Sequence, residues 1–187
     1  MEEFEEFPEL ETERLVLREI TLDDAEWYLR HFSTPEIIEG QGFPAPANIE
    51  AARDEVREYM IDLFMKKEGF RWGITLKDSR ELIGSCGFFK WRREYWSSAE
   101  LGYDLDPKYW GRVIMREALT SIIEFAFKRM MVHRIEVLVM PQNLRSVRLI
   151  ESLGFTKEGL MREHSYFDGR YIDDALYALL EQEWRTG

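Results

Sequence analysis

The middle of the chain combines the features of an anion-binding site. Residues 99–105 have the pattern of a β-strand, Pro107 and Gly111 mark a turn, and a long apolar helix follows Gly111. The first turn of a helix offers backbone N–H groups that have no partner inside the helix, together with the positive end of the helix dipole. A strand that leads directly into such a helix start builds a site suited to a pyrophosphate.

A second set of residues follows about 30 positions later. Pro141-Gln142-Asn143-Leu144-Arg145-Ser146 opens a helix-like stretch, and Gly154-Phe155 and Glu158-Gly159 come after it. In this order, the two sets resemble the GNAT superfamily of N-acetyltransferases, and within it the branch that acetylates the N-terminal alanine or serine of ribosomal proteins. The resemblance extends from Leu10 to Leu180. It implies acetyl-CoA as cofactor and an amine as acceptor.

The resemblance also implies which residues bind the cofactor. In the family, the pyrophosphate loop follows the pattern Gln/Arg-x-x-Gly-x-Gly/Ala, and Asn143 corresponds to an asparagine that binds the pantetheine arm. Aligned on Trp110, the two small positions of the loop fall on Val113 and Met115. The implied cofactor-binding residues are Leu105, Trp110, Gly111, Arg112, Val113, Ile114, Met115, Arg116, Asn143 and Ser146.

Val113 departs from the family pattern at its most diagnostic glycine. A glycine there would permit an unusual φ and a close backbone approach, whereas valine keeps the N–H but adds a stiff, branched side chain. We expect the backbone amides from Arg112 to Met115 to hold the pyrophosphate, with Arg112 and Arg116 as cations. The alternative is an ordinary helix start with apolar packing. Asn143, likewise, is also explained as a plain helix cap.

Acetyl transfer to an amine requires that the amine lose a proton, that the oxyanion be stabilised and that the departing thiolate gain a proton. Many GNAT enzymes donate that proton from a tyrosine, but the corresponding residue here is Ile150. The ribosomal-protein branch has a serine one turn after the asparagine, which corresponds to Ser146. We therefore predict Ser146 as the donor to the thiolate, the alternative being a packing serine.

Glu100 is the predicted base. It lies on the strand that borders the cofactor, just before that strand must part from its neighbour, where a carboxylate could relay a proton through water. A solvated strand carboxylate is an equally consistent interpretation. The ribosomal-protein branch often has a second glutamate near the turn before the last strand. The corresponding residue here is Ser165, with Glu163 and His164 close by. Histidine titrates in the range that suits a base, although a lone histidine is usually incidental.

In the resembling family, the first two helices, their loop and the hairpin near residues 168–169 select the acceptor. Here these first two helices and their loop hold acidic and aromatic residues: Trp27, Tyr28, Phe32, Glu36, Glu39, Phe43 and Pro44. They suit a protonated amine such as a protein N-terminus, and suit a polyamine or an aminoglycoside nearly as well. A non-catalytic binding protein of the same fold is a further alternative, because the sequence departs from the family pattern at Val113, Met115, Ile150 and Ser165.

Length and composition argue against several other classes of protein. The 187 residues, 45% of them hydrophobic, predict one domain over 1–187, with a cofactor core at about 98–160 and acceptor-side helices and loop at about 21–68. The formal net charge of −11 argues against nucleic-acid binding and is compatible with a cationic substrate, or with solubility alone. No apolar run approaches the ~20 residues of a membrane span, and the acidic N-terminus does not resemble a signal peptide. We therefore expect a cytoplasmic protein with no membrane partner.

The single cysteine, Cys86, excludes an internal disulfide and a multi-cysteine metal site, and we expect it to be buried. No metal is required by the expected chemistry. Trp91, Tyr95 and Trp96 are candidates for a homodimer contact, with burial in the core as the alternative.

The pattern of the whole chain predicts an α/β fold, with one mixed, mostly antiparallel sheet of about seven strands and helices on both faces. The expected strands are 15–18, 70–76, 82–91, 98–105, 135–139, 155–164 and 174–180, with a hairpin turn at 168–169. The expected helices run from about 21 to 32, from 48 towards Gly69, from 112 to 130 and from 143 to 153. Ser33-Thr34-Pro35 is expected to end the first of them, and 40–47 is expected to be a loop.

Overall fold

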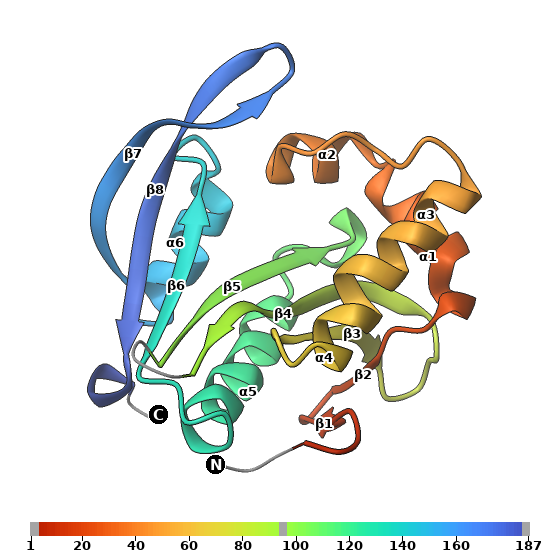
Figure 1. Cartoon of the computed structure of the whole chain (residues 1–187), viewed down its shortest axis with the longest axis horizontal. Coiled ribbons are helices and arrows are strands. Elements are labelled where there is room, and N and C mark those ends of the chain that lie inside the picture. The colour runs from red at the N-terminus through yellow and green to blue at the C-terminus, as the bar shows by residue number, and fades with distance from the viewer. Residues whose placement is uncertain (1–3, 94–96, 185–187) are drawn as a thin grey trace.

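One twisted sheet organises the computed structural model, which describes residues 4–93 and 97–184 (Figure 1). Its eight strands lie in the order β1-β2-β3-β4-β5-β6-β8-β7. The strands are β1 (Leu10–Glu11), β2 (Leu15–Glu19), β3 (Phe70–Leu76), β4 (Leu82–Arg92), β5 (Ser98–Leu105), β6 (Arg134–Val139), β7 (Thr156–Phe167) and β8 (Arg170–Leu180). The helices are α1 (Ala25–Phe32), α2 (Pro35–Gln41), α3 (Ile49–Val56), α4 (Asp62–Met65), α5 (Ile114–Lys128) and α6 (Leu144–Ser152), and a π-helical turn, Arg57–Ile61, joins α3 to α4.

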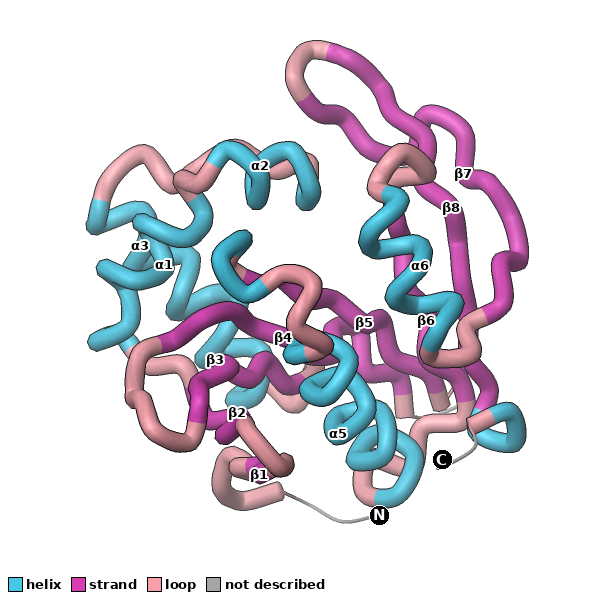
Figure 2. The backbone as a smooth tube through the Cα atoms, turned by 180° about the vertical axis from the view of Figure 1, so that it is seen from behind, coloured by secondary structure: helices cyan, strands magenta, loops and turns pink. Residues whose placement is uncertain are grey.

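The helices lie on both faces of the sheet, as predicted. α1 to α4 lie on one face, and the view from behind shows α5 and α6 on the other (Figure 2). α5 lies against the sheet because its apolar stripe is broad, with Ala118, Leu119 and Ile122 fully buried. The sheet has one strand more than the approximate number expected, because Leu10–Glu11 adds a two-residue edge strand.

Two local expectations were wrong. Residues 40–47 were expected to be a loop, but Gly40 and Gln41 belong to α2, which begins with Pro35 at its first position and ends at Gly42 with a φ of 73°. Proline is well suited to the first position of a helix, so here it starts a new helix instead of only ending the previous one. The last two strands are also longer than expected, extending to Phe167 and from Arg170 around the predicted turn at 168–169.

The remaining expectations about single residues have clear outcomes. Cys86 is fully buried, as predicted, and burial raises the pKa of its thiol to about 12. Trp91 is partly buried, 5.6 Å from the ring of Phe70, while Tyr95 and Trp96 lie outside the described residues. Within residues 4–93 and 97–184, the structure has no helix long and apolar enough to span a membrane.

A buried ionic network joins α1 to the middle of the sheet. Asp104 on β5 accepts hydrogen bonds from the Arg71 guanidinium (2.5 Å) and the Ser85 hydroxyl (2.5 Å), and its other oxygen lies 2.7 Å from Nε2 of His31. Burial alone would raise the pKa of Asp104, but His31, Arg71 and Ser85 outweigh it and hold the pKa below its usual value. The network therefore fixes the position of α1 on β5.

The start of α5 has an unusual backbone. Val113, the residue before the helix, has a φ of 64° and a ψ of 4°, and Gly111 has a φ of 73°. A β-branched residue with positive φ is strained, because its side chain crowds the adjacent carbonyl oxygen. The glycine-type turn is therefore formed here by a valine, whose side chain is 61% exposed.

Replacing Asp104 by asparagine is expected to lower the free energy of unfolding by about 3–5 kcal/mol, because it leaves Arg71 buried without its counter-charge. Urea denaturation at pH 7 measures this loss. Since the pKa of Asp104 is lower in the folded chain, its contribution is present above its unfolded pKa and disappears as the pH falls through the folded value. Glu81→Gln, in the exposed Arg30–Glu81 pair, is the control and should cost less than about 1 kcal/mol. Equal effects of the two substitutions would contradict the role of the network.

The strain at Val113 predicts an inverted order of two substitutions. Val113→Gly should be more stable than Val113→Ala by about 1 kcal/mol, because only glycine adopts this φ without cost. At Thr120, an exposed position inside α5, the order should be reversed, with alanine more stable than glycine by about 1 kcal/mol. Denaturation of the four variants measures both differences, and the same order at both sites would show that Val113 is not strained.

Candidate active site

The site is centred on the place where β5 and β6 part. These parallel strands pair only from Ser98–Arg134 to Glu100–Glu136, and beyond this point β5 pairs with β4 and β6 pairs with β8. The strands separate immediately after Glu100, which confirms the place where β5 was predicted to part from its neighbour. Among the described strands, none fills the opening, so the facing backbone edges of residues 101–105 and 137–139 can pair with an extended molecule that carries amides.

One end of the opening leads to the start of α5, the predicted anion site. The first hydrogen bond of the helix runs from the N–H of Glu117 to the carbonyl of Val113 (3.1 Å), so the N–H groups of residues 114–116 have no acceptor inside the helix. The side chains of Ile114 and Met115 are buried, which leaves only their backbone to contact a ligand. Arg112 and Arg116 are exposed beside these amides. The Arg14 guanidinium braces the turn by donating to the carbonyl of Arg112 (3.2 Å).

Two side-chain contacts reach α6, one from β5 and one from the loop before α5. The hydroxyls of Tyr103 and Ser146 lie 2.6 Å apart, and the Arg145 guanidinium lies 3.3 Å from the centre of the Trp110 ring. The Trp110 indole in turn donates to the carbonyl of Leu105 (2.8 Å), which fixes the ring at the end of β5. Burial raises the pKa of Tyr103 to about 12, so its phenol keeps its proton at neutral pH.

Asn143 connects the start of α6 to α2. Its Oδ1 accepts from the N–H of Ser146 (3.2 Å), which confirms the expected helix cap. Its Nδ2 donates to the carbonyl of Gly40 (3.4 Å). The predicted pantetheine partner is therefore also in contact with the helix that borders the acceptor side.

Glu100 lies on the other face of the sheet from Tyr103, because successive side chains of a strand alternate. Its Oε2 lies 2.7 Å from Nζ of Lys90, and its side chain is 25% exposed. Glu136, its partner across the strand pair, is held by the Nε of Arg134 at 2.8 Å. Two carboxylates therefore lie side by side where the strands part, each with one basic neighbour.

The hairpin of β7 and β8 carries a second polar cluster. Nδ1 of His164 lies 2.9 Å from Oδ2 of Asp174, and the Ser165 hydroxyl donates to the same carboxylate oxygen. His164 is thus not the lone histidine considered from the sequence. Ile150, the position of the family tyrosine, is fully buried in the core, as expected of a residue that takes no part in proton donation.

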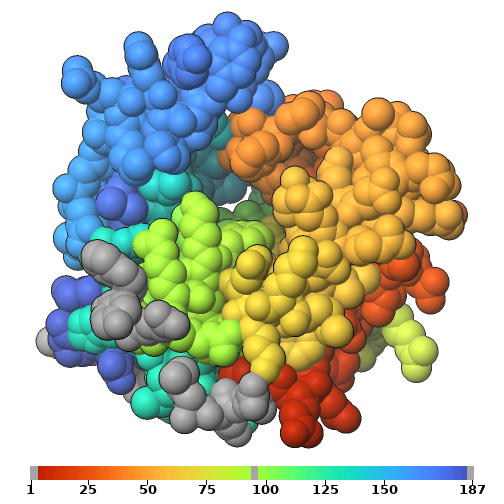
Figure 3. Space-filling model, viewed as in Figure 1, coloured from red at the N-terminus to blue at the C-terminus, as the bar shows by residue number. Residues whose placement is uncertain are grey.

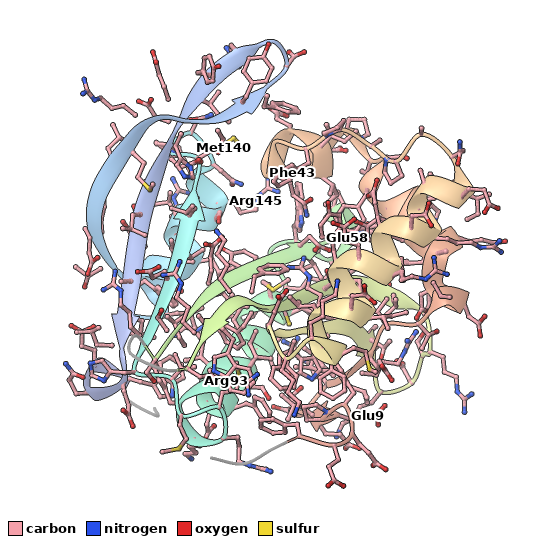
Figure 4. All side chains as sticks on the ribbon, in the orientation of Figure 1. Glu9, Phe43, Glu58, Arg93, Met140 and Arg145 are labelled. Atoms are coloured by element: carbon pink, nitrogen blue, oxygen red, sulfur yellow. The ribbon has the colours of Figure 1, made fainter. Side chains whose placement is uncertain are left out.

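A hollow opens between α2 and the β7–β8 hairpin, on the face that carries Glu100 (Figure 3). Phe43, which follows α2 and is 70% exposed, and Met140, at the end of β6, lie on opposite sides of this opening (Figure 4). The hollow leads to the parted strands from the side opposite α5 and α6.

Sequence reasoning missed three residues of the site: Tyr103, Arg145 and Asp174. The sequence pattern assigns Tyr103 and Asp174 only to strands, and because these strands hold other polar residues, such as Glu100 and Asp173, no local signal sets the two apart. Arg145 was noted only as part of the motif around Asn143. Its contact with Trp110 depends on how α6 meets the loop before α5, which no local pattern specifies.

The residues present fit coenzyme A. The unpaired backbone edges of β5 and β6 match a pantetheine arm, which carries two amides, and the start of α5 with Arg112 and Arg116 matches a pyrophosphate. The valine at position 113 does not remove any of these groups, because its backbone already adopts the required turn and its N–H remains.

Comparisons with known proteins agree with this geometry. The family model for the acetyltransferase (GNAT) domain matches residues 14–156. The chain is 36% identical to the uncharacterized N-acetyltransferase p20 of Bacillus licheniformis, over 94% of this chain and 97% of the relative. It is 34% identical to the [ribosomal protein uS5]-alanine N-acetyltransferase of Escherichia coli K12, over 95% and 93% of the two chains.

The fold matches that of a solved structure, the ribosomal-protein-S5-alanine acetyltransferase of Vibrio fischeri, with a TM-score of 0.83, 24% identity and coverage of 96% of this chain and 100% of that one. The fold, the parted strands and the sequence relatives lead to one conclusion. The chain belongs to the GNAT acetyltransferase family and is an N-acetyltransferase that uses acetyl-CoA.

Proposed function

We propose that this enzyme acetylates the N-terminal α-amine of a protein, such as a ribosomal protein. The observation that carries the proposal is the hollow between α2 and the β7–β8 hairpin, which opens to the surface on the face where Glu100 and Glu136 lie side by side. An α-amine at the end of a flexible chain can enter such an opening while the rest of the chain stays outside. The 34% identity to an alanine N-acetyltransferase that acts on ribosomal protein uS5 supports the same acceptor class.

Acetyl-CoA supplies an acetyl thioester that is already activated for attack by an amine. The enzyme therefore has to position the two reactants and to move two protons. Ser146, one turn into α6, is the proposed donor to the sulfur. Its hydroxyl is hydrogen-bonded to the Tyr103 phenol, which is held in its protonated form by burial. Tyr103 can thus donate to Ser146 as Ser146 donates to the sulfur, so the pair acts as a short proton relay.

Glu100 is the proposed carboxylate for the acceptor side. It forms an ion pair with Lys90, and a carboxylate at this place attracts an ammonium group and orders water next to it. The overall charge of −11 acts in the same direction on any cationic acceptor. Small polyamines would respond to the same charges, so they form the second candidate class of acceptors.

A panel of acceptors tests the proposal. With acetyl-CoA, short peptides that begin with Ala or Ser should show kcat/KM values at least about tenfold above those of spermidine and of an aminoglycoside, because only peptides use the hollow as well as the amine site. Release of the CoA thiol measures the rate. The same peptides with a blocked α-amine are the control and should be inactive. Preference for spermidine or the aminoglycoside would contradict the proposal.

Ser146→Ala tests the proposed chemistry separately from binding. The variant should lose about 10–100-fold in kcat, because the sulfur departs without its proton donor, while the Kd for acetyl-CoA measured by calorimetry stays the same. Ser152→Ala, at the other end of α6, is the matched control: its hydroxyl bonds only the carbonyl of Leu149 among the described residues. Unchanged turnover in Ser146→Ala would remove Ser146 from the mechanism.

A further inference from the structure

The polar cluster on the β7–β8 hairpin is built around a bulge. β7 pairs with β8 from Gly159–Leu176 to Met161–Asp174 and again from Ser165–Ile172, so three residues of β7 bulge out against one residue, Asp173, on β8. Glu163, in the middle of the bulge, has a φ of 53°, and its N–H donates to Oδ1 of Asp173 (2.8 Å). Bulges of this kind redirect a side chain, and here the redirected side chain is His164.

His164 and Asp174 have the geometry of an oriented imidazole. Nδ1 of His164 lies 2.9 Å from Oδ2 of Asp174, whose side chain is 8% exposed, while the imidazole is 37% exposed. The ionised carboxylate accepts the Nδ1 proton, which makes Nε2 the basic nitrogen of the neutral ring. Nε2 makes no hydrogen bond to any residue in the described part of the chain. The basic nitrogen therefore remains available to a ligand.

The register of the sheet places this pair on the acceptor face. Ala175 pairs with Val139, and both belong to the core that packs against α5 and α6. Since side chains alternate along a strand, Asp174 points to the opposite face, which is also the face of Glu136 and its partner Glu100. The carboxylate that orients His164 and the two carboxylates at the parting of the strands thus share one surface.

The pair also lies next to the rim of the opening. A methyl group added to Gly42, at the end of α2, would lie 3.8 Å from both Ile172 and Phe167 of the hairpin. Ile172 is the strand partner of Ser165, which neighbours His164 and donates to Asp174. Two residues before Gly42, the carbonyl of Gly40 accepts from Asn143. The end of α2 therefore links the His164 cluster to the start of α6, where the cofactor arm is expected.

We propose that His164, oriented by Asp174, is the general base that takes the proton from the acceptor amine. One N–H bond of the ammonium group breaks and its proton forms a bond with Nε2, and the electron pair left on nitrogen forms the C–N bond to the acetyl carbon. The C–S bond then breaks, the sulfur takes a proton from Ser146, and the nitrogen loses its second surplus proton to solvent, from which the Ser146–Tyr103 pair is reprotonated. The imidazolium is stabilised by Asp174 and releases its proton to solvent after turnover. Glu100, held by Lys90, then attracts the ammonium group but does not accept its proton directly.

This inference rests on the proposed function, and it is tested by His164→Asn. Asparagine can keep a hydrogen bond to Asp174 but cannot accept the proton. With the best peptide of the panel, kcat should fall by about 100-fold or more, the rising limb of its pH profile near neutrality should disappear, and added imidazole should restore part of the rate. The Kd for acetyl-CoA should not change, because the base lies on the acceptor side.

Three further variants separate proton transfer from a structural effect. Asp174→Asn should lower kcat, because the imidazole loses the carboxylate that orients it and stabilises its protonated form during turnover. Tyr166→Phe changes an exposed residue of the same hairpin, whose ring packs on Tyr171, and should keep kcat within about threefold, since the His164–Asp174 pair stays in place. Glu100→Gln should raise the KM for the peptide while the rising limb remains.

The state of the imidazole can be measured in the wild-type chain even if a variant fails to fold. Nitrogen NMR of labelled protein, with the three histidines assigned by substitution, should find the neutral ring of His164 protonated on Nδ1. A proton on Nε2 would overturn the proposal, as would a His164→Asn enzyme with the wild-type rate and pH profile. If the wild type binds acetyl-CoA but acetylates no peptide, the proposed function itself fails, and this result is distinct from the two others.

Discussion

The parting of β5 from β6 is the constraint on which the rest of the site depends. Three residue pairs hold the two parallel strands together, and the pairing then stops although both strands continue. Backbone groups that lose their partners in this way are costly unless water or a ligand satisfies them. The fold keeps this edge open in a fixed place, because each strand is anchored on its other side, β5 by β4 and β6 by β8.

The two halves of the molecule on either side of the opening are connected by a few specific contacts. Tyr103 meets Ser146 and Trp110 meets Arg145 on the cofactor side, while Asn143 meets Gly40 on the acceptor side. Beneath the acceptor side, the buried Asp104 network holds α1 against β5. These contacts place the reacting groups on elements that are rigid because of their burial, so catalysis can depend mainly on position.

The sequence predicted the fold well because its patterns are strong and local. The broad apolar stripe of α5, the alternation along β6 and the Asp168–Gly169 turn each indicate one structure. α2 was missed because Pro35 was interpreted only as the end of the preceding helix. In the site, Ser146 and Asn143 could be located by their spacing from a family motif. Tyr103, Arg145 and the His164–Asp174 pair could not, because each depends on a contact between distant segments, or on a bulge that no local pattern announces.

Amide hydrogen exchange with and without coenzyme A is the most direct test of the opening as the cofactor site. The account predicts slower exchange on binding at the backbone N–H groups of residues 101–105 and 113–116, and no change in β2 and β3, which lie away from the opening. Such a pattern would show that the parted edge of β5 and the strained turn at Val113 together hold the cofactor. Binding without protection of either segment, or protection confined to other parts of the sheet, would contradict it.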